Sequence, residues 1–338
     1  MQVVHVTKAV GMALAQDLTR VIPGEFKGVA FKKGHIVRNE DIPAMLEMGK
    51  DHIYIFELGK DDIHENEAAR QLANIASGAN VTLETPSEGK VNIKAGKRGL
   101  LRIDSKLLTR INMMDGVCVS TLHSDTLVEC GQLIASAKVI PLALPKTTLD
   151  AVRALCQEKD IVRIAPLASR RAGLVITGNE VYYGRIEDKF QSVIKKKLEN
   201  LDCTLTQTII LPDDANKITE AIKELASNND IVFVTGGMSV DPDDVTPLAV
   251  SQTGAKVIVY GTPVLPGAMF LMAYLKGKPV LGIPACGMFS KNTVLDVVLP
   301  KVIVGDKITK KYIASLGHGG LCQACADGCR FPNCSFCK

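Results

Sequence analysis

The chain has 338 residues, of which 46% are hydrophobic and 22% are charged, a balance that excludes an intrinsically disordered protein. The formal net charge is only +4, Trp is absent and aromatic residues amount to 4%, so little is available for stacking on nucleic-acid bases. The length suits about two domains with cores of their own, and we expect no nucleic-acid partner.

The first half of the chain alternates short helical and β-like segments. A helix is predicted over residues 39–49, where an N-cap, an acidic first turn and a terminal glycine occur, and a strand is predicted at 52–58. An amphipathic helix is predicted at 65–76. Short β-like runs separated by Gly, Ser and Asp then dominate residues 81–144. We expect a β-rich α+β domain over residues 1–167.

The pattern changes near residue 168, after a predicted helix at 149–157. Strands and helices then alternate: strands are predicted at residues 172–177, 203–211, 231–234, 256–259 and 280–283, and helices at 186–198 and 215–226. This alternation is typical of βαβ units around a parallel sheet. We expect an α/β domain over residues 168–308, with a mostly parallel sheet sandwiched by helices.

One uncharged stretch, residues 257–275, is long enough to span a membrane. Two prolines and two glycines would break a helix in its middle, so a strand, a turn and a second buried segment are predicted instead. The first ten residues lack the apolar core of a secretory signal, because His5 and Lys8 interrupt it. We therefore expect a cytoplasmic protein that does not associate with membranes.

Residues 230–246 run from apolar β-branched residues into a glycine pair and an aspartate-rich loop. The glycines at 236–237 allow positive φ and let backbone N–H groups approach an anion. Asp241, Asp243 and Asp244 repel a phosphate unless a cation such as Mg²⁺ lies between them. The spacing fits a metal-assisted phosphate site, and it also fits a solvated turn after a buried strand.

Acidic residues follow three of the predicted strands in the second half. The segments are Thr177-Gly178-Asn179-Glu180, Pro212-Asp213-Asp214 and the loop from Thr235 to Thr246. An acidic residue after a strand often simply caps the next helix, so each segment alone is unspecific. The carboxyl ends of parallel strands share one edge of a sheet, and we therefore expect Glu180, Asp213 and Asp244 to converge there.

The same segments carry a family resemblance. Thr-Gly-Gly-x-Ser at 235–239, Asp-Asp-Val-Thr at 243–246 and Thr-Gly-Asn-Glu at 177–180 resemble the molybdopterin-binding fold of molybdenum cofactor biosynthesis, to which molybdopterin molybdenumtransferases and gephyrin belong. Gly282-Ile283-Pro284 is similar to the closing strand of that fold. The resemblance covers about residues 168–308 and extends more loosely into the N-terminal half.

The resemblance implies a molybdopterin site where Mg²⁺ and carboxylates serve either the adenylylation of molybdopterin or the insertion of molybdate. Glu180, Asp213 and Asp244 would then be catalytic, with Asp244 also holding Mg²⁺ against a phosphate. Backbone N–H groups from Gly236 to Ser239 would hold that phosphate. The implied cofactor-binding residues are Thr177, Gly178, Thr235, Gly236, Gly237, Ser239 and Thr246. Similar proteins are oligomers, so a homo-oligomer is expected.

The chain departs from the family pattern at three places. Asp243 stands where adenylylating members often carry Arg, Asn179 replaces a common Asp, and Ala285-Cys286-Gly287 replaces Gly-Asn-Pro. Three arginines near the proposed edge are candidates to compensate for the missing positive charge: Arg170, Arg171 and Arg185. The pattern favours an enzyme resembling the molybdenumtransferases. A molybdopterin carrier or sensor without turnover is the alternative, and a nucleotide pyrophosphatase on the same fold is a third interpretation.

The ten cysteines form two groups. Five lie among apolar neighbours and are expected in the core, namely Cys118, Cys130, Cys156, Cys203 and Cys286. The other five crowd into the last 17 positions as Cys322, Cys325, Cys329, Cys334 and Cys337. Without a secretory signal a disulfide framework is disfavoured, and two CxxC pairs so close together predict a metal site.

Zinc and an iron–sulfur cluster each take four ligands of this kind, so five thiols serve either metal centre. A redox dithiol pair is the remaining alternative. We expect residues 309–338 to be a Cys-rich metal-binding tail. Its expected task is to sense redox state or to recruit a molybdenum enzyme.

Overall fold

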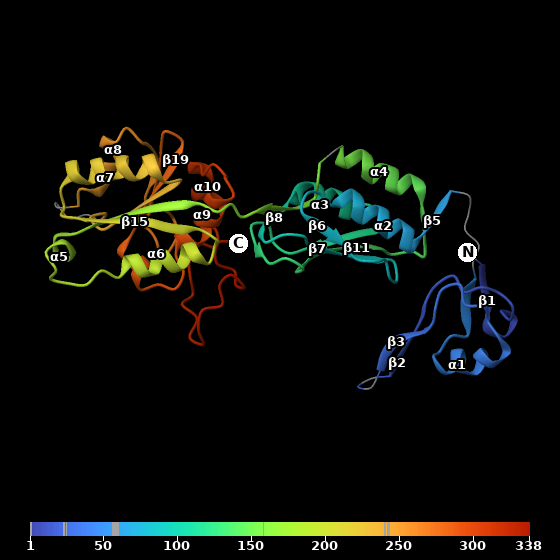
Figure 1. The fold of residues 1–338 in the computed structure, drawn as a ribbon. Coiled ribbons are helices and arrows are strands. Elements are labelled where there is room, and N and C mark those ends of the chain that lie inside the picture. The colour runs from blue at the N-terminus through green and yellow to red at the C-terminus, as the bar shows by residue number, and fades with distance from the viewer. Residues whose placement is uncertain are drawn as a thin grey trace. The chain divides into compact units, whose positions relative to one another are not determined.

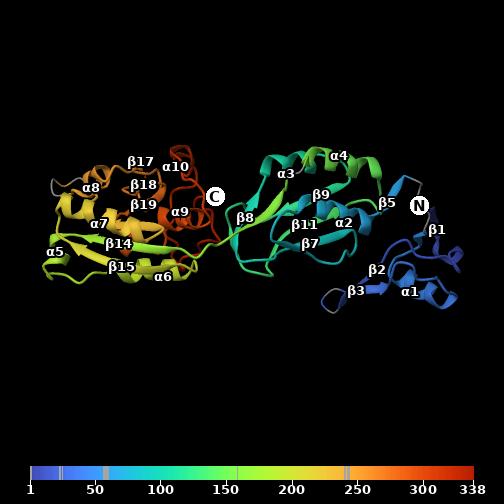
Figure 2. The same cartoon turned by 45° about the horizontal axis from the view of Figure 1, so that its top comes forward.

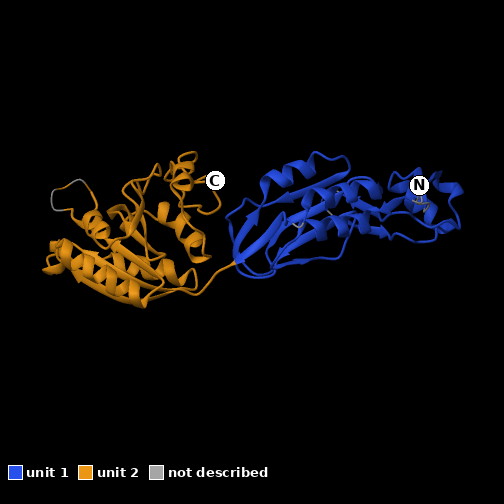
Figure 3. Cartoon of the chain, turned by 90° about the horizontal axis from the view of Figure 1, so that it is seen from above, with its two compact units in different colours: residues 1–165 blue, residues 166–338 orange. Residues whose placement is uncertain are grey.

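The computed structural model describes residues 2–22, 24, 26–55, 61–157, 159–239, 241 and 244–338. Asp243 and positions 56–58 of the predicted strand lie outside the described residues. The chain forms two compact units, Met1–Ala165 and Pro166–Lys338, which Figure 3 colours separately. Each unit buries hydrophobic residues of its own.

The N-terminal part of the first unit contains small two-stranded sheets. Strand β1 pairs antiparallel with β4, and β2 pairs antiparallel with β3. The predicted helix at 39–49 is a 3-10 turn that continues into α1 and ends at Glu47. The elements are β1 Gln2–His5, η1 Val6–Lys8, β2 Leu18–Ile22, β3 Phe26–Phe31, η2 Asn39–Asp41, α1 Ile42–Glu47 and β4 His52–Ile55.

The remainder of the first unit packs helices on antiparallel strands. Helix α2 buries an alanine-rich stripe with Leu72 against β7 and β11, as its amphipathic pattern predicts. The sheet orders are β6-β7-β11-β9, β10-β8-β13 and β12-β5. The elements are β5 Asp62–His64, α2 Glu65–Ala76, β6 Val81–Leu83, β7 Lys90–Ala95, β8 Gly99–Ile103, α3 Ser105–Asn112, β9 Val117–Thr121, β10 Leu127–Val128, β11 Leu133–Val139, β12 Ala143–Pro145, α4 Lys146–Cys156 and β13 Val162–Pro166.

The second unit alternates strands and helices. Its strands are β14 Arg171–Thr177, β15 Thr204–Leu211, β16 Ile231–Thr235, β17 Lys256–Tyr260, β18 Leu271–Leu275 and β19 Lys278–Ile283. Its helices are α5 Asn179–Tyr182, α6 Phe190–Glu199, α7 Ala215–Asn228, α8 Thr246–Gln252, η3 Ala285–Met288, α9 Val294–Ile303 and α10 Lys310–Ser315. The mixed α/β class expected from the sequence is confirmed.

Six strands form the sheet of the second unit in the order β15-β14-β16-β19-β18-β17. The first four are mutually parallel, whereas β18 runs antiparallel to both of its neighbours. The uncharged stretch at 257–275 thus supplies β17, a turn and β18, as predicted. Within the part of the chain that the structure describes, every helix is too short or too polar to cross a bilayer.

Helices cover both faces of this sheet (Figures 1 and 2). Helices α7 and α8 pack together on one face, where Val175, Val232 and Val234 form the core with them. Helix α6 packs on the other face, beside α9, and Lys197 of α6 pairs with Asp296 of α9. The β-branched strands are therefore buried on both sides, which is what a parallel sheet between helices requires.

One predicted boundary is wrong in the second unit. Helix α6 begins at Phe190 and not at Ile186, because the Asp188 carboxylate accepts hydrogen bonds from the N–H groups of Phe190 and Gln191. An acidic residue at this place satisfies N–H groups that have no partner inside the helix. Residues 186–189 are consequently free to line a pocket rather than a helix face.

A candidate ligand pocket at the carboxyl edge of the sheet

Three adjacent parallel strands deliver the predicted site segments to one edge of the sheet. In the strand register Thr177 lies beside Leu211, Ile176 lies beside Thr235, and Thr235 lies beside Ile283. The loops that follow these residues therefore leave the sheet together. The expected meeting of the strand ends is confirmed, and ligands bind at such edges in α/β sheets.

The glycine loop after β16 is shaped by close packing. Gly236 and Gly237 have φ values of +85° and +51°. A Cβ atom on Gly236 would lie 2.1 Å from the carbonyl oxygen of Thr177, a backbone atom that has no room to yield. Only glycine fits there, so the sequence places the tight turn immediately after the strand.

Two buried threonines hold this turn from behind. The Thr246 hydroxyl donates to the carbonyl oxygen of Gly236 at 2.9 Å and lies 3.3 Å from the Thr177 hydroxyl. The N–H of Thr246 donates to the carbonyl oxygen of Gly237. Thr246 and Thr235 are fully buried and do not line the pocket. Thr246 therefore positions the glycine turn. The sequence had instead predicted that Thr246 contacts the ligand directly.

Asp213 supports the neighbouring loop in a similar way. Its Oδ2 accepts a hydrogen bond from the N–H of Asn179 at 3.0 Å, and the Asn179 side-chain oxygen accepts one from the N–H of Asp213 at 3.4 Å. This reciprocal pair joins the ends of β14 and β15. Neither Asp213 nor Gly178 lines the pocket, so both lie one layer behind the predicted ligand contacts.

Asp244 caps the glycine loop from its far end. Its Oδ2 accepts hydrogen bonds from the N–H groups of Ser239 at 2.7 Å and Asp241 at 3.1 Å. The Ser239 N–H is thus committed to Asp244 and does not point at a phosphate, which corrects the prediction for that group. The Tyr260 hydroxyl adds a second clamp by donating to the carbonyl oxygens of Met238 and Ser239.

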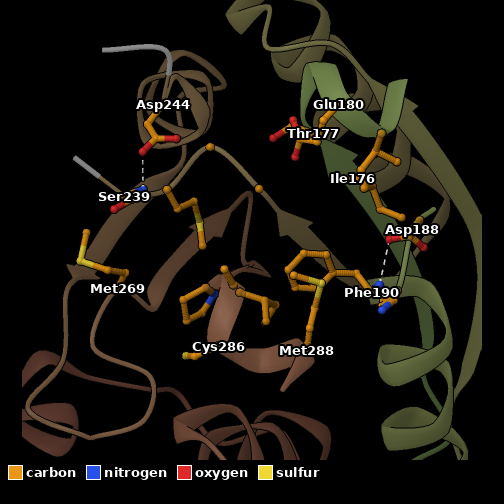
Figure 4. A pocket seen from close by; sticks show the side chains of 18 of the residues that line it. Ile176, Thr177, Glu180, Asp188, Phe190, Ser239, Asp244, Met269, Cys286 and Met288 are labelled. Atoms are coloured by element: carbon orange, nitrogen blue, oxygen red, sulfur yellow. Dashed lines mark hydrogen bonds between the residues drawn. The ribbon is translucent and has the colours of Figure 1, made fainter. Parts of the chain in front are cut away.

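These loops enclose a pocket of about 580 Å³ (Figure 4). Asp244 and Ser239 stand on one side of it, and Thr177 and Glu180 stand on the other. Of the residues predicted from the sequence, the pocket brings together Thr177, Glu180, Gly236, Gly237, Ser239 and Asp244. The volume is that of an ordinary small-molecule site.

The opposite wall is apolar and rich in sulfur. It combines Phe190 of α6, Cys286 and Met288 of η3, and Met269 of the loop before β18. The prediction of a core position was wrong for Cys130, which is exposed, and for Cys118 and Cys286, which are half-buried, whereas Cys156 and Cys203 are buried. Burial raises the pKa of the Cys286 thiol, so the neutral thiol faces the pocket at neutral pH. This wall suits a flat, apolar or soft ligand surface.

The polar rim of the pocket is mostly acidic. Glu180, Glu187, Asp188 and Asp244 contribute carboxylates, and among the described lining residues only Lys189 carries a positive charge. Arg170 and Arg171 do not compensate, since they lie at the amino end of β14 and Arg170 donates to the carbonyl oxygen of Ile303. The Arg185 guanidinium lies over the Tyr183 ring, 5.5 Å from its centroid.

The rim fits a magnesium ion only if a ligand shares it. In the described part of the chain no three His, Cys, Asp or Glu side chains are gathered to hold a metal ion. A shared Mg²⁺ needs just one or two protein carboxylates, because phosphate oxygens and waters complete its coordination. Glu180 and Asp244 are the predicted carboxylates that face the pocket.

The Cys-rich tail lies against the same unit. Its cysteines are unbridged, and Cys322, Cys334 and Cys337 are half-buried while Cys325 and Cys329 are exposed. Burial, together with the nearby thiols of Cys334 and Cys322, raises the pKa of Cys337 to about 11. Within the described residues, which include the whole tail, no three Cys, His, Asp or Glu side chains are gathered to hold a metal ion, so the metal-binding tail stays a prediction.

Comparisons with known proteins match parts of both units. Residues 173–303 match a family model described as "Probable molybdopterin binding domain", and residues 3–57 match a separate one described as "Domain of unknown function (DUF8806)". Protein PAE0875 of Pyrobaculum aerophilum is 33% identical over 89 residues, which are 26% of this chain and 34% of that protein. The molybdopterin molybdenumtransferase of Haemophilus influenzae is 26% identical over 178 residues, 52% of this chain and 43% of the transferase.

Among solved structures, the protein CinA from Thermoplasma acidophilum, whose function is given as unknown, is 17% identical. The match covers 40% of this chain and 99% of that one, with a TM-score of 0.36. The chain spans less than half the length of the curated relatives described above.

The second unit is a doubly wound α/β domain with a ligand pocket beyond the carboxyl ends of its parallel strands. Its glycine loop and acidic rim fall inside the segment matched by the family model. Over residues 173–303 the chain is similar to the molybdopterin-binding domain family.

Proposed function

We propose that this protein binds molybdopterin in the pocket of its second unit and handles it in molybdenum cofactor biosynthesis with the help of Mg²⁺. The observation that carries the proposal is the pocket itself, which joins the Thr177 and Gly236 strand ends, Glu180 and Asp244 within the family segment. The finer expectation is an enzyme resembling the molybdenumtransferases, which inserts molybdate or turns over adenylylated molybdopterin.

The two walls of the pocket suit the two ends of such a ligand. The apolar wall around Phe190, Met269 and Met288 takes the flat ring system. The rim takes the phosphate, with the amides of the glycine turn and Lys189 as donors. Mg²⁺ bound there would offset the charge on the phosphate. Glu180 and Asp244 would hold that ion, while Thr246 and Asp213 keep the two loops in position.

The test is molybdopterin binding to the full chain under anaerobic conditions, with and without Mg²⁺. Glu180→Gln should weaken the Mg²⁺-dependent binding by on the order of tenfold, since one charged contact is lost. Glu220→Gln is the matched control, because Glu220 is exposed on α7 away from the pocket. Wild-type protein that binds no molybdopterin in either condition would exclude the proposal.

A carrier or sensor without turnover is the second candidate, and the charge of the rim favours it. The arginines expected near the phosphate lie elsewhere or stack on a tyrosine, which leaves Lys189 as the positive charge among the described lining residues. Tight molybdopterin binding with no product in the presence of Mg²⁺, ATP and molybdate would support the carrier. Product formation that Asp244→Ala abolishes would support the enzyme.

The tail is proposed to bind zinc or an iron–sulfur cluster through its cysteines, and to dock a molybdenum enzyme. The support is the spacing of the five tail cysteines, which includes two CxxC pairs. Metal analysis and an absorption spectrum of anaerobically purified protein distinguish the two metals, because thiolate-bound iron clusters are coloured and zinc is not. A tail without either metal would remove this part of the proposal.

A further inference from the structure

A polar pocket of about 570 Å³ lies in the first unit. It is formed where β8 runs into α3, by the turn before β10, and by the loop that leads from α4 into β13. Its lining consists of residues 102–106, Ser124, Lys159, Asp160 and Arg163. These residues lie outside both segments matched by the family models. The proposed function leaves this pocket unused.

Backbone hydrogen bonds hold the segments around the pocket together. The N–H of Asp104 donates to the carbonyl oxygen of Ile161 at 3.0 Å. The N–H of Ile103 donates to the Ser124 hydroxyl oxygen at 3.2 Å. Because this hydroxyl accepts a hydrogen bond from the backbone, its own proton can be donated to a ligand.

Four cationic side chains from three segments line the pocket: Arg102, Lys106, Lys159 and Arg163. The Arg102 guanidinium is 14% exposed and pairs with Asp125, which fixes its position. Within the part of the chain that the structure describes, the other three side chains form no ion pair and no side-chain hydrogen bond. Like charges gathered at one place repel each other, and an anion bound between them removes that repulsion.

Two carboxylates line the same pocket. Asp104 is the N-cap of α3, and its Oδ1 accepts a hydrogen bond from the N–H of Leu107 at 3.0 Å. Asp160 lies against Gly78, where a Cβ atom would come within 2.1 Å of the Asp160 Cγ. With Arg102 neutralised by Asp125, three cations face these two carboxylates. The Asp160 carboxylate is therefore the group that opposes an anionic ligand.

The lining also indicates which anion fits. Among the described lining residues there is no aromatic side chain on which a nucleic-acid base could stack. Cations on three separate segments can contact more than one anionic group of the same ligand. The volume is that of an ordinary small-molecule site.

We propose that this pocket binds a small molecule that carries two adjacent phosphate groups. Lys106, Lys159 and Arg163 contact the phosphates, and the Ser124 hydroxyl donates a hydrogen bond to them. Arg102 adds a positive charge of fixed position. The site belongs to the first unit, so it does not rest on the function proposed for the second.

Inorganic pyrophosphate is the probe, titrated calorimetrically into the full chain without Mg²⁺, which the proposed site of the second unit uses. One site per chain with a Kd below about 1 mM is expected at about 0.1 M chloride. Inorganic phosphate and sulfate each present a single tetrahedral anion and should bind at least about tenfold more weakly.

Exposed side chains provide the variants. Lys106→Gln and Arg163→Gln should each weaken pyrophosphate binding by about five- to tenfold, since one charged contact is lost. Asp160→Asn should tighten binding by about threefold, because the opposing carboxylate is removed. Arg110→Gln is the matched control and should bind like the wild type, since Arg110 is exposed on the last turn of α3 and does not line the pocket.

Thermal unfolding of each variant distinguishes a loss of binding from a loss of folding, and an unchanged Tm is expected. Wild-type protein that binds no pyrophosphate overturns the inference. Equal binding by the wild type, Lys106→Gln and Arg163→Gln also overturns it, as does weaker binding by a folded Asp160→Asn protein. Sulfate that binds as tightly as pyrophosphate overturns the assignment to paired phosphate groups.

Discussion

Thr246 offers the sharpest test of how the pocket is built. Thr246→Val keeps the shape of the side chain but removes the hydroxyl that donates to the carbonyl oxygen of Gly236 at 2.9 Å. Thr246 is fully buried and Thr177 nearly so, so the contact between their hydroxyls is lost away from bulk water. Leaving a buried polar group without its partner costs about 1–3 kcal/mol. We expect the second unit to lose about that much stability and its ligand affinity to fall.

Urea unfolding followed by tyrosine fluorescence measures this loss, because five of the six tyrosines belong to the second unit. Thr253→Val is the matched control. Thr253 is also buried on the same helical segment, and its hydroxyl bonds to Val250 and Ala255 rather than to the glycine turn. The control should lose a comparable amount of stability and bind ligand like the wild type. Equal loss of ligand affinity in both variants would refute the positioning role of Thr246, as would a fully stable Thr246→Val.

Three further predictions address other parts of the chain. Gly236→Ala should cost at least about 2 kcal/mol, measured in the same urea experiment, because φ is positive and Cβ would meet the Thr177 carbonyl; a neutral effect would contradict the geometry. Cys286, whose pKa is raised by burial, should alkylate slowly at pH 8, react faster as pH rises, and be protected by pocket ligand in mass spectrometry; reaction unaffected by ligand would argue against the pocket. Burial raises the pKa of Glu65 above its unfolded value, so its contribution to stability is present at low pH and is lost as pH rises through the folded pKa. Calorimetry should therefore show that Glu65→Gln raises the Tm of the first unit at pH 8 but not at pH 4. A Tm that rises only at pH 4 would contradict this pH dependence.

Strong periodic patterns in the sequence predicted much of the fold. The alanine-rich stripe of α2 and the β-branched runs of β14 and β16 define their elements locally, and the structure places them where they were expected. The start of α6 was misjudged, since apolar Ile186 continues the helical pattern although Asp188 caps the helix. Hydrophobic periodicity does not show which N–H groups a side chain satisfies.

The sequence predicted which segments gather at the site. It did not predict which of their residues face the pocket and which support the loops behind it. Strand order brought Thr177, Glu180, Gly236 and Asp244 to one pocket, because parallel strand ends share an edge. Whether a residue faces the ligand or supports the loop depends on side-chain packing, which spacing does not encode. Cys286 was missed as a pocket residue for the same reason: its apolar neighbours fit a wall as well as a core.

The positions of Arg170 and Arg171 show a related limit. The sequence places them close to Thr177, yet they lie at the opposite end of the same strand. Seven residues of β-strand extend over about 20 Å. Residues that are close in the sequence of one strand can therefore lie at opposite edges of the sheet. The predicted homo-oligomer stays a prediction.

Strand β14 also determines how the second unit is connected to what precedes it. The polypeptide enters this strand at Arg171, while its other terminus, Thr177, lies at the pocket. A change in the chain before Pro166 therefore reaches the sheet at the end of β14 that is remote from the pocket. Such an arrangement lets evolution exchange attached modules while the recognition surface remains intact.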